Sequence, residues 1–208
     1  MHQSSLDGSG FPMQNSAAAN TPFTGDSRMR STLGTTLLAV CALPTLVVAA
    51  AQAQNPVTNG IRAMAQRQTK NIVDAAEEMP ADKYGYKPTP AQMSYGDVVA
   101  HLIKEGNNYL CSAASGMKQP DADKFAGADA KDKLVAGLKA SFKFCETALA
   151  GIQDAQLGDS IDFFGGRKVT KGMAGLITVA DWADHYSQMA IYLRLNGLLP
   201  PTAKKAMD

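Results

Sequence analysis

Apolar residues recur every three or four positions in four separate stretches of this chain, and this spacing constrains the fold more than any other feature. The first stretch runs from Thr58 to Met79. The second begins at Ser94, which with Asp97 resembles a capping box. The third spans residues 134–152, and the fourth spans residues 171–196 and ends before a glycine and two prolines. The sequence therefore predicts an all-α four-helix bundle.

Two connecting segments have distinctive compositions. Between the first two helices lies Tyr-Gly-Tyr-Lys-Pro-Thr-Pro at residues 84–90, where two prolines favour extended backbone. We expect this Pro-rich connector to carry the crossover of the bundle. Before the fourth helix, Ile161–Val169 contains Gly165-Gly166, which suits the positive φ angles of a tight turn. This predicts a small hairpin-like segment.

The N-terminal region is unlike the rest. Residues 1–28 lack apolar periodicity, so they are interpreted as a disordered extension or as a misassigned start that precedes Met29. Arg30, an apolar run over residues 33–51 and an Ala-Gln-Ala ending at Ala53 are typical of a secretory signal peptide. An uncleaved anchor is the alternative, although Pro44 interrupts the run. The sequence thus predicts a signal peptide at 29–53, a mature domain at 54–208, and a periplasmic or secreted location.

Cysteine usage and charge add two further expectations. Cys41 leaves with the signal peptide, so export places Cys111 and Cys145 in an oxidising compartment, where they form either a disulfide or two buried thiols. The formal net charge is +1, and the local lysine pairs Lys131/Lys133 and Lys204/Lys205 are interpreted as solvated surface, so we expect no nucleic-acid partner. We expect no membrane association once the signal is cleaved.

Histidine is scarce, which makes its positions informative. His2 lies in the discarded leader, whereas His101 and His185 fall inside the second and fourth helices. Facing helices of a bundle can bring two imidazole ligands together. Asp181 lies four residues before His185, on the same helix face, so these three residues could form a two-His, one-carboxylate metal site.

Other residues near the histidines admit two interpretations. Asp97 and Glu105 flank His101 at four-residue spacing, and either could be a further ligand or orient the imidazole from outside the ligand set. Glu105 is the candidate catalytic residue that would move a proton. The alternative is simpler: an Asp–His pair four residues apart is often only a surface charge pair, and Trp182 and Tyr186 are interpreted as packing residues.

Two segments resemble the DinB-like (DinB/YfiT) superfamily of metal-binding four-helix bundles. The first, Tyr-Gly-Tyr-Lys-Pro-Thr-Pro at residues 84–90 followed by a Ser-led helix bearing His101, is similar to that family's Y-x-[FY]-x-P-T-P connector and second helix. The second, residues 184–201, resembles the family's closing helix. The resemblance covers essentially the whole of the predicted mature domain.

The resemblance implies a bundle in which one His from the second helix and two from the fourth bind a divalent metal. By position His101 and His185 match two of these ligands, and Asp181 stands where the family has its remaining His. Aspartate there makes the site harder and more negative, or marks a site that has decayed. The expected cofactor is a divalent metal ion, namely zinc, nickel, iron or manganese, and a homodimer is possible because relatives often dimerise.

The predicted function is a metal-dependent hydrolase or transferase with an unknown small-molecule substrate. Relatives that use low-molecular-weight thiols favour the transferase, but those thiol pools are cytoplasmic, so export favours a hydrolase. The alternative is a non-catalytic metal-binding or small-ligand-binding bundle of the cell envelope.

Overall fold

The computed structural model describes residues 55–121 and 123–206. The predicted disordered extension and the predicted signal peptide lie outside the described residues. The elements are α2 (Pro56–Glu78), η1 (Ala81–Lys83), α3 (Tyr95–His101), the π-helix η2 (Leu102–Tyr109), α4 (Leu110–Ser115), α5 (Lys131–Ala150), η3 (Asp154–Gln156), β1 (Ser160–Phe163), η4 (Phe164–Gly166), β2 (Arg167–Thr170), α6 (Lys171–Leu195) and α7 (Pro201–Lys204).

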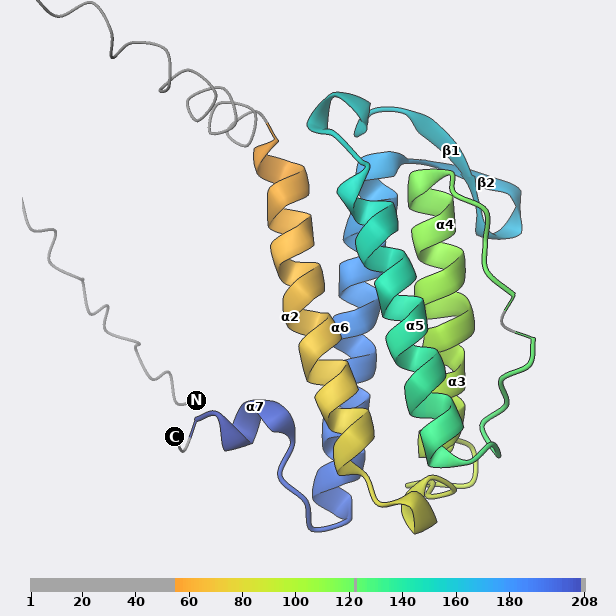
Figure 1. The fold of residues 1–208 in the computed structure, drawn as a ribbon, viewed down its shortest axis with the longest axis vertical. Coiled ribbons are helices and arrows are strands. Elements are labelled where there is room, and N and C mark those ends of the chain that lie inside the picture. Colours follow the sequence, from red (N-terminus) through yellow and green to blue (C-terminus); the bar gives the residue numbers. More distant parts are fainter. Residues whose placement is uncertain (1–54, 122, 207–208) are drawn as a thin grey trace, which may run out of the picture. The chain divides into compact units, whose positions relative to one another are not determined.

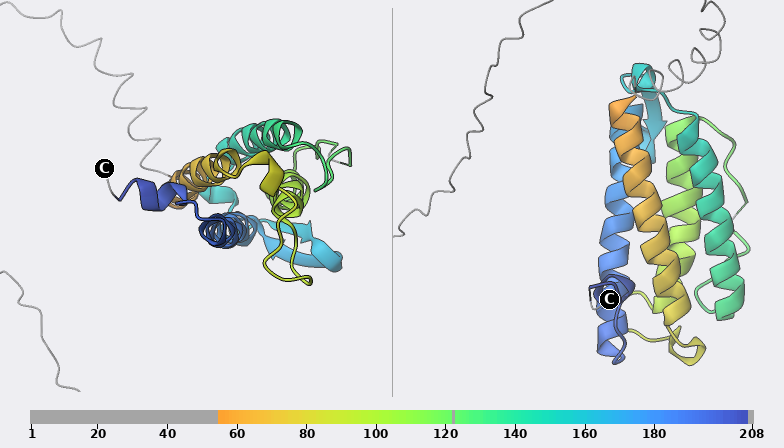
Figure 2. Two further views of the ribbon diagram at one scale, coloured as in Figure 1. Left: turned by 90° about the horizontal axis from the view of Figure 1, so that it is seen from below. Right: turned by 60° about the vertical axis from the view of Figure 1, so that its left-hand side comes forward.

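Four helical rods form the bundle, which confirms the predicted all-α fold (Figure 1). Three rods are the single helices α2, α5 and α6, and the fourth is the continuous run of α3, η2 and α4. Seen end-on, the rods occupy four corners, with α2 beside both α5 and α6 (Figure 2). The composite rod contacts α5 and α6 on its two sides. His101 and His185 therefore lie on neighbouring rods.

The connections differ in one respect from the sequence-based expectation. The Pro-rich connector turns at one end of the bundle, whereas the connection that runs the length of the bundle joins α4 to α5 (Figure 1). The described part of this connection, residues 116–121 and 123–130, is held against the bundle by close contacts: the ring of Phe125 covers Gly137, and Gly127 lies against Gly96. A β-carbon on Gly96 would lie 2.1 Å from the carbonyl oxygen of Gly127, so only glycine permits this approach.

Both ends of α2 are completed by residues from elsewhere in the chain. At its start, the backbone N–H groups of Val57 and Thr58 donate to the carboxylate of Asp154 at 3.0 and 2.8 Å, which satisfies donors that a helix leaves unpaired. At its end, the hydroxyl groups of Tyr84 and Tyr95 donate to the carbonyls of its last turn, each at 2.6 Å. These two tyrosines thereby anchor the Pro-rich connector to the bundle.

The hairpin before α6 is confirmed. Strands β1 and β2 pair antiparallel, from Ser160 opposite Thr170 to Phe163 opposite Arg167. Gly165 and Gly166 have φ angles of 65° and 71°, as the Gly-Gly pair predicted.

The core fills the centre of the bundle. The largest fully buried side chains are Trp182, Tyr95, Tyr192, Ile72, Met79, Leu102, Ile103, Leu134, Leu138, Met189, Leu193 and Val98. Trp182 and Tyr186 are both buried, in agreement with their interpretation as packing residues. Within the described part of the chain, no helix has the length and apolarity that crossing a membrane requires.

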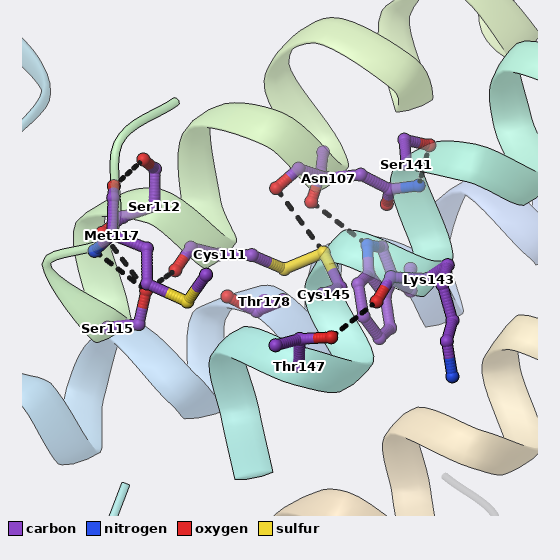
Figure 3. Close-up of a disulfide and its surroundings, with 12 residues drawn as sticks. Asn107, Cys111, Ser112, Ser115, Met117, Ser141, Lys143, Cys145, Thr147 and Thr178 are labelled. Carbon is purple, nitrogen blue, oxygen red and sulfur yellow. Dashed lines mark hydrogen bonds between the residues drawn. A yellow bond between two sulfur atoms is a disulfide. The ribbon is translucent and has the colours of Figure 1, made fainter. Parts of the chain in front are cut away.

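A disulfide joins Cys111 on α4 to Cys145 on α5, so of the two interpretations of this pair the structure has the bridge (Figure 3). The two Cα atoms are 5.2 Å apart, within the range that a disulfide spans. Both cysteines are fully buried. Beside them, the amide of Asn107 on η2 donates to Ser141 on α5 at 2.7 Å, which adds a second link between the same rods.

Candidate metal centre

His101, Asp181 and His185 come together between two rods of the bundle. Each offers one ligand atom, and these atoms all lie within 4.8 Å of one another. The rings of the two histidines lie edge to face, with centroids 4.8 Å apart. All three residues are partly buried. The structure thus brings together the three residues that were predicted as metal ligands.

Local structure explains how these side chains meet. Asp181 and His185 lie one turn apart on α6, with 3.6 Å between Oδ1 of Asp181 and Nε2 of His185. His101 is the last residue of α3, immediately before the π-helix η2. A π-helix changes the angular position of the residues that follow, and such segments are frequent at functional sites.

The carboxylate of Asp181 has an unusual environment. Its Oδ1 faces His185, while its Oδ2 is buried and has no hydrogen-bond partner among the described residues. A buried carboxylate oxygen without a partner carries a desolvation cost that a cation would relieve. The donor set therefore fits a divalent cation: two imidazoles and one carboxylate, with one oxygen unused.

A glycine makes room for this carboxylate. A β-carbon on Gly106 would lie 3.0 Å from Oδ2 of Asp181 and 3.2 Å from the side chain of Leu102. Next to it, the indole N–H of Trp182 donates to the carbonyl of Gly106 at 3.0 Å. Trp182 follows Asp181 on α6, so this bond fixes the spacing between α6 and η2 at the site.

The surroundings of His185 favour its charged form. Burial lowers the pKa of His185, but the hydrogen bonding and charge of Asp181, together with Gln188 and Asp184, outweigh it and raise the pKa above the ordinary value of 6.5. On the other side of the ring, Nδ1 lies 3.3 Å from Oε1 of Gln188. Without a metal, His185 and Asp181 can thus form an ion pair, which a bound cation would replace.

The two acidic residues that flank His101 have different positions. Oε2 of Glu105 lies 3.1 Å from Nδ1 of His101, and this carboxylate is about half exposed. Asp97 instead completes the capping box of α3: its backbone N–H donates to Ser94, whose own N–H donates to Oδ2 of Asp97. Glu105 therefore contacts the candidate ligand, whereas Asp97 holds the start of the helix.

A separate groove of about 550 Å³ lies between α2 and α5. Its apolar lining includes Phe142, Leu149 and Trp182, and its rim includes Lys70 and Lys139. None of the three candidate ligands lines it. Trp182, which lines the groove, is the residue next to the candidate ligand Asp181 in the sequence.

Sequence reasoning missed three residues that shape the site: Gly106, Gln188 and Tyr192. Gly106 had a usable signal, because an isolated glycine inside an amphipathic helix commonly has a packing reason. Gln188 lies three residues after His185, so helical spacing alone could have placed it near the ring, whereas its partner Tyr192 has no sequence signal beyond the four-residue spacing from Gln188.

Comparison with known proteins supports the same fold. A family model described as the DinB superfamily matches residues 64–189. A search of the curated proteins gave no match.

Several solved structures are similar. A DinB-like protein from Bacillus cereus superposes with a TM-score of 0.58 at 17% identity, covering 69% of this chain and 95% of that chain. A DinB-like protein from Bacillus subtilis gives 0.54 at 21%, covering 66% and 92%. A mycothiol-dependent maleylpyruvate isomerase gives 0.51 at 12%, covering 64% and 60%. At these identities the similarity shows the fold alone.

Proposed function

This chain belongs to the DinB superfamily, and from that premise we propose that it is an exported metal-binding bundle that acts as a metal-dependent hydrolase on a small-molecule substrate. One observation carries the proposal. Two imidazoles and a carboxylate from neighbouring rods place ligand atoms within 4.8 Å of one another. The unpaired, buried Oδ2 of Asp181 supports it, because an ion pair with His185 alone leaves that oxygen unused.

The donor set narrows the class of metal. Two nitrogen ligands and one oxygen ligand suit zinc, nickel, iron or manganese, and three protein ligands leave positions open for water or substrate. When bound there, such an ion supplies Lewis acidity, which activates water and polarises a carbonyl group. Hydrolysis needs only water as a co-substrate, and a bound ion of this kind activates water.

The protein's own residues would then orient and move protons. Oε2 of Glu105 lies 3.1 Å from Nδ1 of His101, so this carboxylate would orient the ring and leave Nε2 available as the ligand atom. The half-exposed carboxylate also retains Oε1, which could take a proton from an attacking water. Glu105 thus combines an orienting role with its predicted catalytic role.

Export is supported by the disulfide. Buried bridges such as Cys111–Cys145 form and persist in oxidising compartments and are rare in the cytosol. Together with the predicted signal peptide at residues 29–53, this favours the periplasm or the extracellular space. Fractionation of cells that express the full chain tests it: we expect the processed protein in the periplasmic or secreted fraction, and unprocessed protein in the cytosol would contradict export.

Metal content is the decisive test of the site. Protein purified without a His tag, analysed by inductively coupled plasma mass spectrometry, should hold about one divalent ion per chain. The double variant His101→Ala, His185→Ala should contain no bound metal, and Asp181→Ala should bind the metal more weakly. Asp74→Ala is the matched control, because Asp74 pairs with Lys70 four residues away on α2, far in sequence from the site. Equal metal content in the double variant and the control would overturn the proposal.

Activity separates a hydrolase from a carrier. The metal-loaded protein should hydrolyse at least one member of a panel of esters, amides and phosphoesters. Glu105→Gln should lower the rate of the fully metal-loaded protein, while its metal affinity stays within about tenfold of that of the unaltered protein. A fully loaded protein that is inert across the panel would favour the alternative of a non-catalytic metal-binding bundle.

A further inference from the structure

A series of hydrogen bonds runs from His185 to Met93, just before the start of α3. Nδ1 of His185 lies 3.3 Å from Oε1 of Gln188, and Nε2 of Gln188 donates to the hydroxyl of Tyr192 at 3.2 Å. That hydroxyl donates to the backbone carbonyl of Met93 at 2.9 Å. His185, Gln188 and Tyr192 all belong to α6, whereas Met93 precedes α3, whose last residue is His101.

The direction of each of these three hydrogen bonds follows from the last acceptor, the backbone carbonyl of Met93. A backbone carbonyl only accepts, so the single proton of the Tyr192 hydroxyl is committed to Met93. The Tyr192 oxygen can then only accept from Gln188, which must turn its NH₂ group toward Tyr192 and its carbonyl oxygen toward His185. Because that oxygen also only accepts, Nδ1 of His185 must carry a hydrogen.

We infer that Gln188, held by Tyr192, is a positioning residue that sets the tautomer of His185. With the hydrogen on Nδ1, the lone pair of a neutral His185 is on Nε2, the nitrogen that lies 3.6 Å from Oδ1 of Asp181. The ring therefore presents its ligand atom to the same point as the carboxylate. Neutral imidazole binds a metal only through its unprotonated nitrogen, so the opposite tautomer would direct a hydrogen at the site.

Each of the two histidines has a partner side chain at Nδ1, but the two partners differ in chemistry. Nδ1 of His101 lies beside a carboxylate, Glu105, and Nδ1 of His185 beside a neutral amide, Gln188, so each partner leaves Nε2 of its histidine available as the ligand atom. An amide does not add charge to a site that already contains Asp181. The amide itself needs orienting, and the nearly inaccessible Tyr192 supplies this through its bond to Met93.

The tautomer is measured directly by long-range ¹H–¹⁵N correlation spectroscopy on metal-free, ¹⁵N-labelled full chain, at a pH above the pKa of His185. Two acceptors compete for the hydrogen of the neutral ring: Oε1 of Gln188 lies 3.3 Å from Nδ1, within hydrogen-bond distance, whereas Oδ1 of Asp181 lies 3.6 Å from Nε2. We therefore expect the unaltered protein to show hydrogen on Nδ1, with the signal assigned by its loss in His185→Gln. Gln188→Leu removes the acceptor and should shift His185 toward the Nε2–H form. Gln188→Glu retains an acceptor and should restore the Nδ1–H form.

Metal titration completes the test. Zinc affinity should fall by about tenfold or more in Gln188→Leu and recover in Gln188→Glu. Tyr192→Phe should give a mixture of tautomers, because the amide is then free to flip. Ser187→Ala is the matched control: Ser187 is an exposed neighbour on α6 that bonds only the carbonyl of Ala183 in the structure, and its replacement should alter neither the tautomer nor the affinity.

This inference rests on the proposed metal site, but the two fail differently. A metal-free protein that shows hydrogen on Nε2 of His185, or a Gln188→Leu variant that matches Ser187→Ala in both tautomer and affinity, would overturn the role of Gln188 alone. Unaltered protein that takes up no zinc would overturn the metal site, while the spectra would still report whether Gln188 sets the tautomer.

Discussion

Gly106 and Asp181 meet where the π-helix η2 approaches α6: a β-carbon on Gly106 would lie 3.0 Å from Oδ2 of the aspartate. That oxygen is buried, and no described residue bonds it. The absence of a side chain at residue 106 therefore determines where the carboxylate can lie. It also lets the indole of Trp182 reach the carbonyl of the same residue.

Replacing Gly106 with Ala should accordingly damage metal binding more than stability. The added methyl group must displace Oδ2 of Asp181 or the side chain of Leu102, and we expect zinc affinity to fall by about tenfold, as for other changes that misplace a ligand. Isothermal titration calorimetry measures the change. Gly60→Ala on α2 is the control, because a β-carbon there meets nothing within 4 Å. It should raise the free energy of unfolding by about 0.5–1 kcal/mol and leave affinity unchanged. Equal affinities in the two variants would contradict this account of Gly106.

Trp182→Phe should lower stability and metal affinity together. Phenylalanine cannot donate to the carbonyl of Gly106, and the smaller ring leaves space in a site where Trp182 is 1% exposed. We expect a loss of about 2–4 kcal/mol in the free energy of unfolding, measured with urea. Phe142, which packs edge to face on Trp182, provides the comparison. Phe142→Leu should be destabilising without altering metal affinity, and an affinity loss as large as that of Trp182→Phe would assign the effect to general loosening of the core.

Removal of the disulfide should destabilise the bundle strongly. Cys111 and Cys145 are 34 residues apart, and closing a loop of that length stabilises a fold by about 4 kcal/mol in the chain-entropy model. The Cys111→Ala, Cys145→Ala double variant should lose about this amount in urea unfolding. The unaltered protein in reductant should show a similar loss. Mass spectrometry of non-reduced protein is the direct check, since two free thiols in exported material would show that the bridge does not form.

The capping box of α3 should make stability depend on pH in the acid range. The hydrogen bond from the Ser94 side chain lowers the pKa of Asp97 below its ordinary 3.8; burial opposes this, while the Ser94 N–H and Lys87 assist it. A lowered pKa means that the stabilisation is complete above the unfolded value and is lost as pH falls through the folded pKa. Asp97→Asn keeps the shape without the charge, so it should be less stable than the unaltered protein at about pH 5 and nearly equal at about pH 2. A constant difference in urea midpoint across that range would exclude this contribution.

Much of the fold could be read from the chain because it depends on local patterns. Periodic apolar residues predicted the helices, Ser94 and Asp97 predicted the start of α3, and Gly165-Gly166 predicted the turn of the hairpin. The two scarce histidines and Asp181 were singled out by residue type and four-residue spacing, which place side chains on a helix face. Each of these signals lies within a few residues of the feature that it predicts.

Other features depend on contacts between distant parts of the chain, which no local pattern encodes. The carboxylate of Asp154, which is 96 residues from Thr58 in the sequence, caps the start of α2. The helix begins at Pro56 rather than at the predicted Thr58. The long connection joins α4 to α5 and does not lie at the Pro-rich connector, and close contacts such as Gly127 on Gly96 hold its described part against the bundle.

The sequence by itself determined which residue types were available to bind a metal and on which helix faces they lie, since both follow from spacing along one helix. Only the tertiary structure decided that α6 and the composite rod bring the rings of His101 and His185 to 4.8 Å. It alone aligned Gln188 and Tyr192 with the carbonyl of Met93. The physical reason is that a ligand set and its hydrogen bonds need a distance and a direction in space, and packing between rods fixes both.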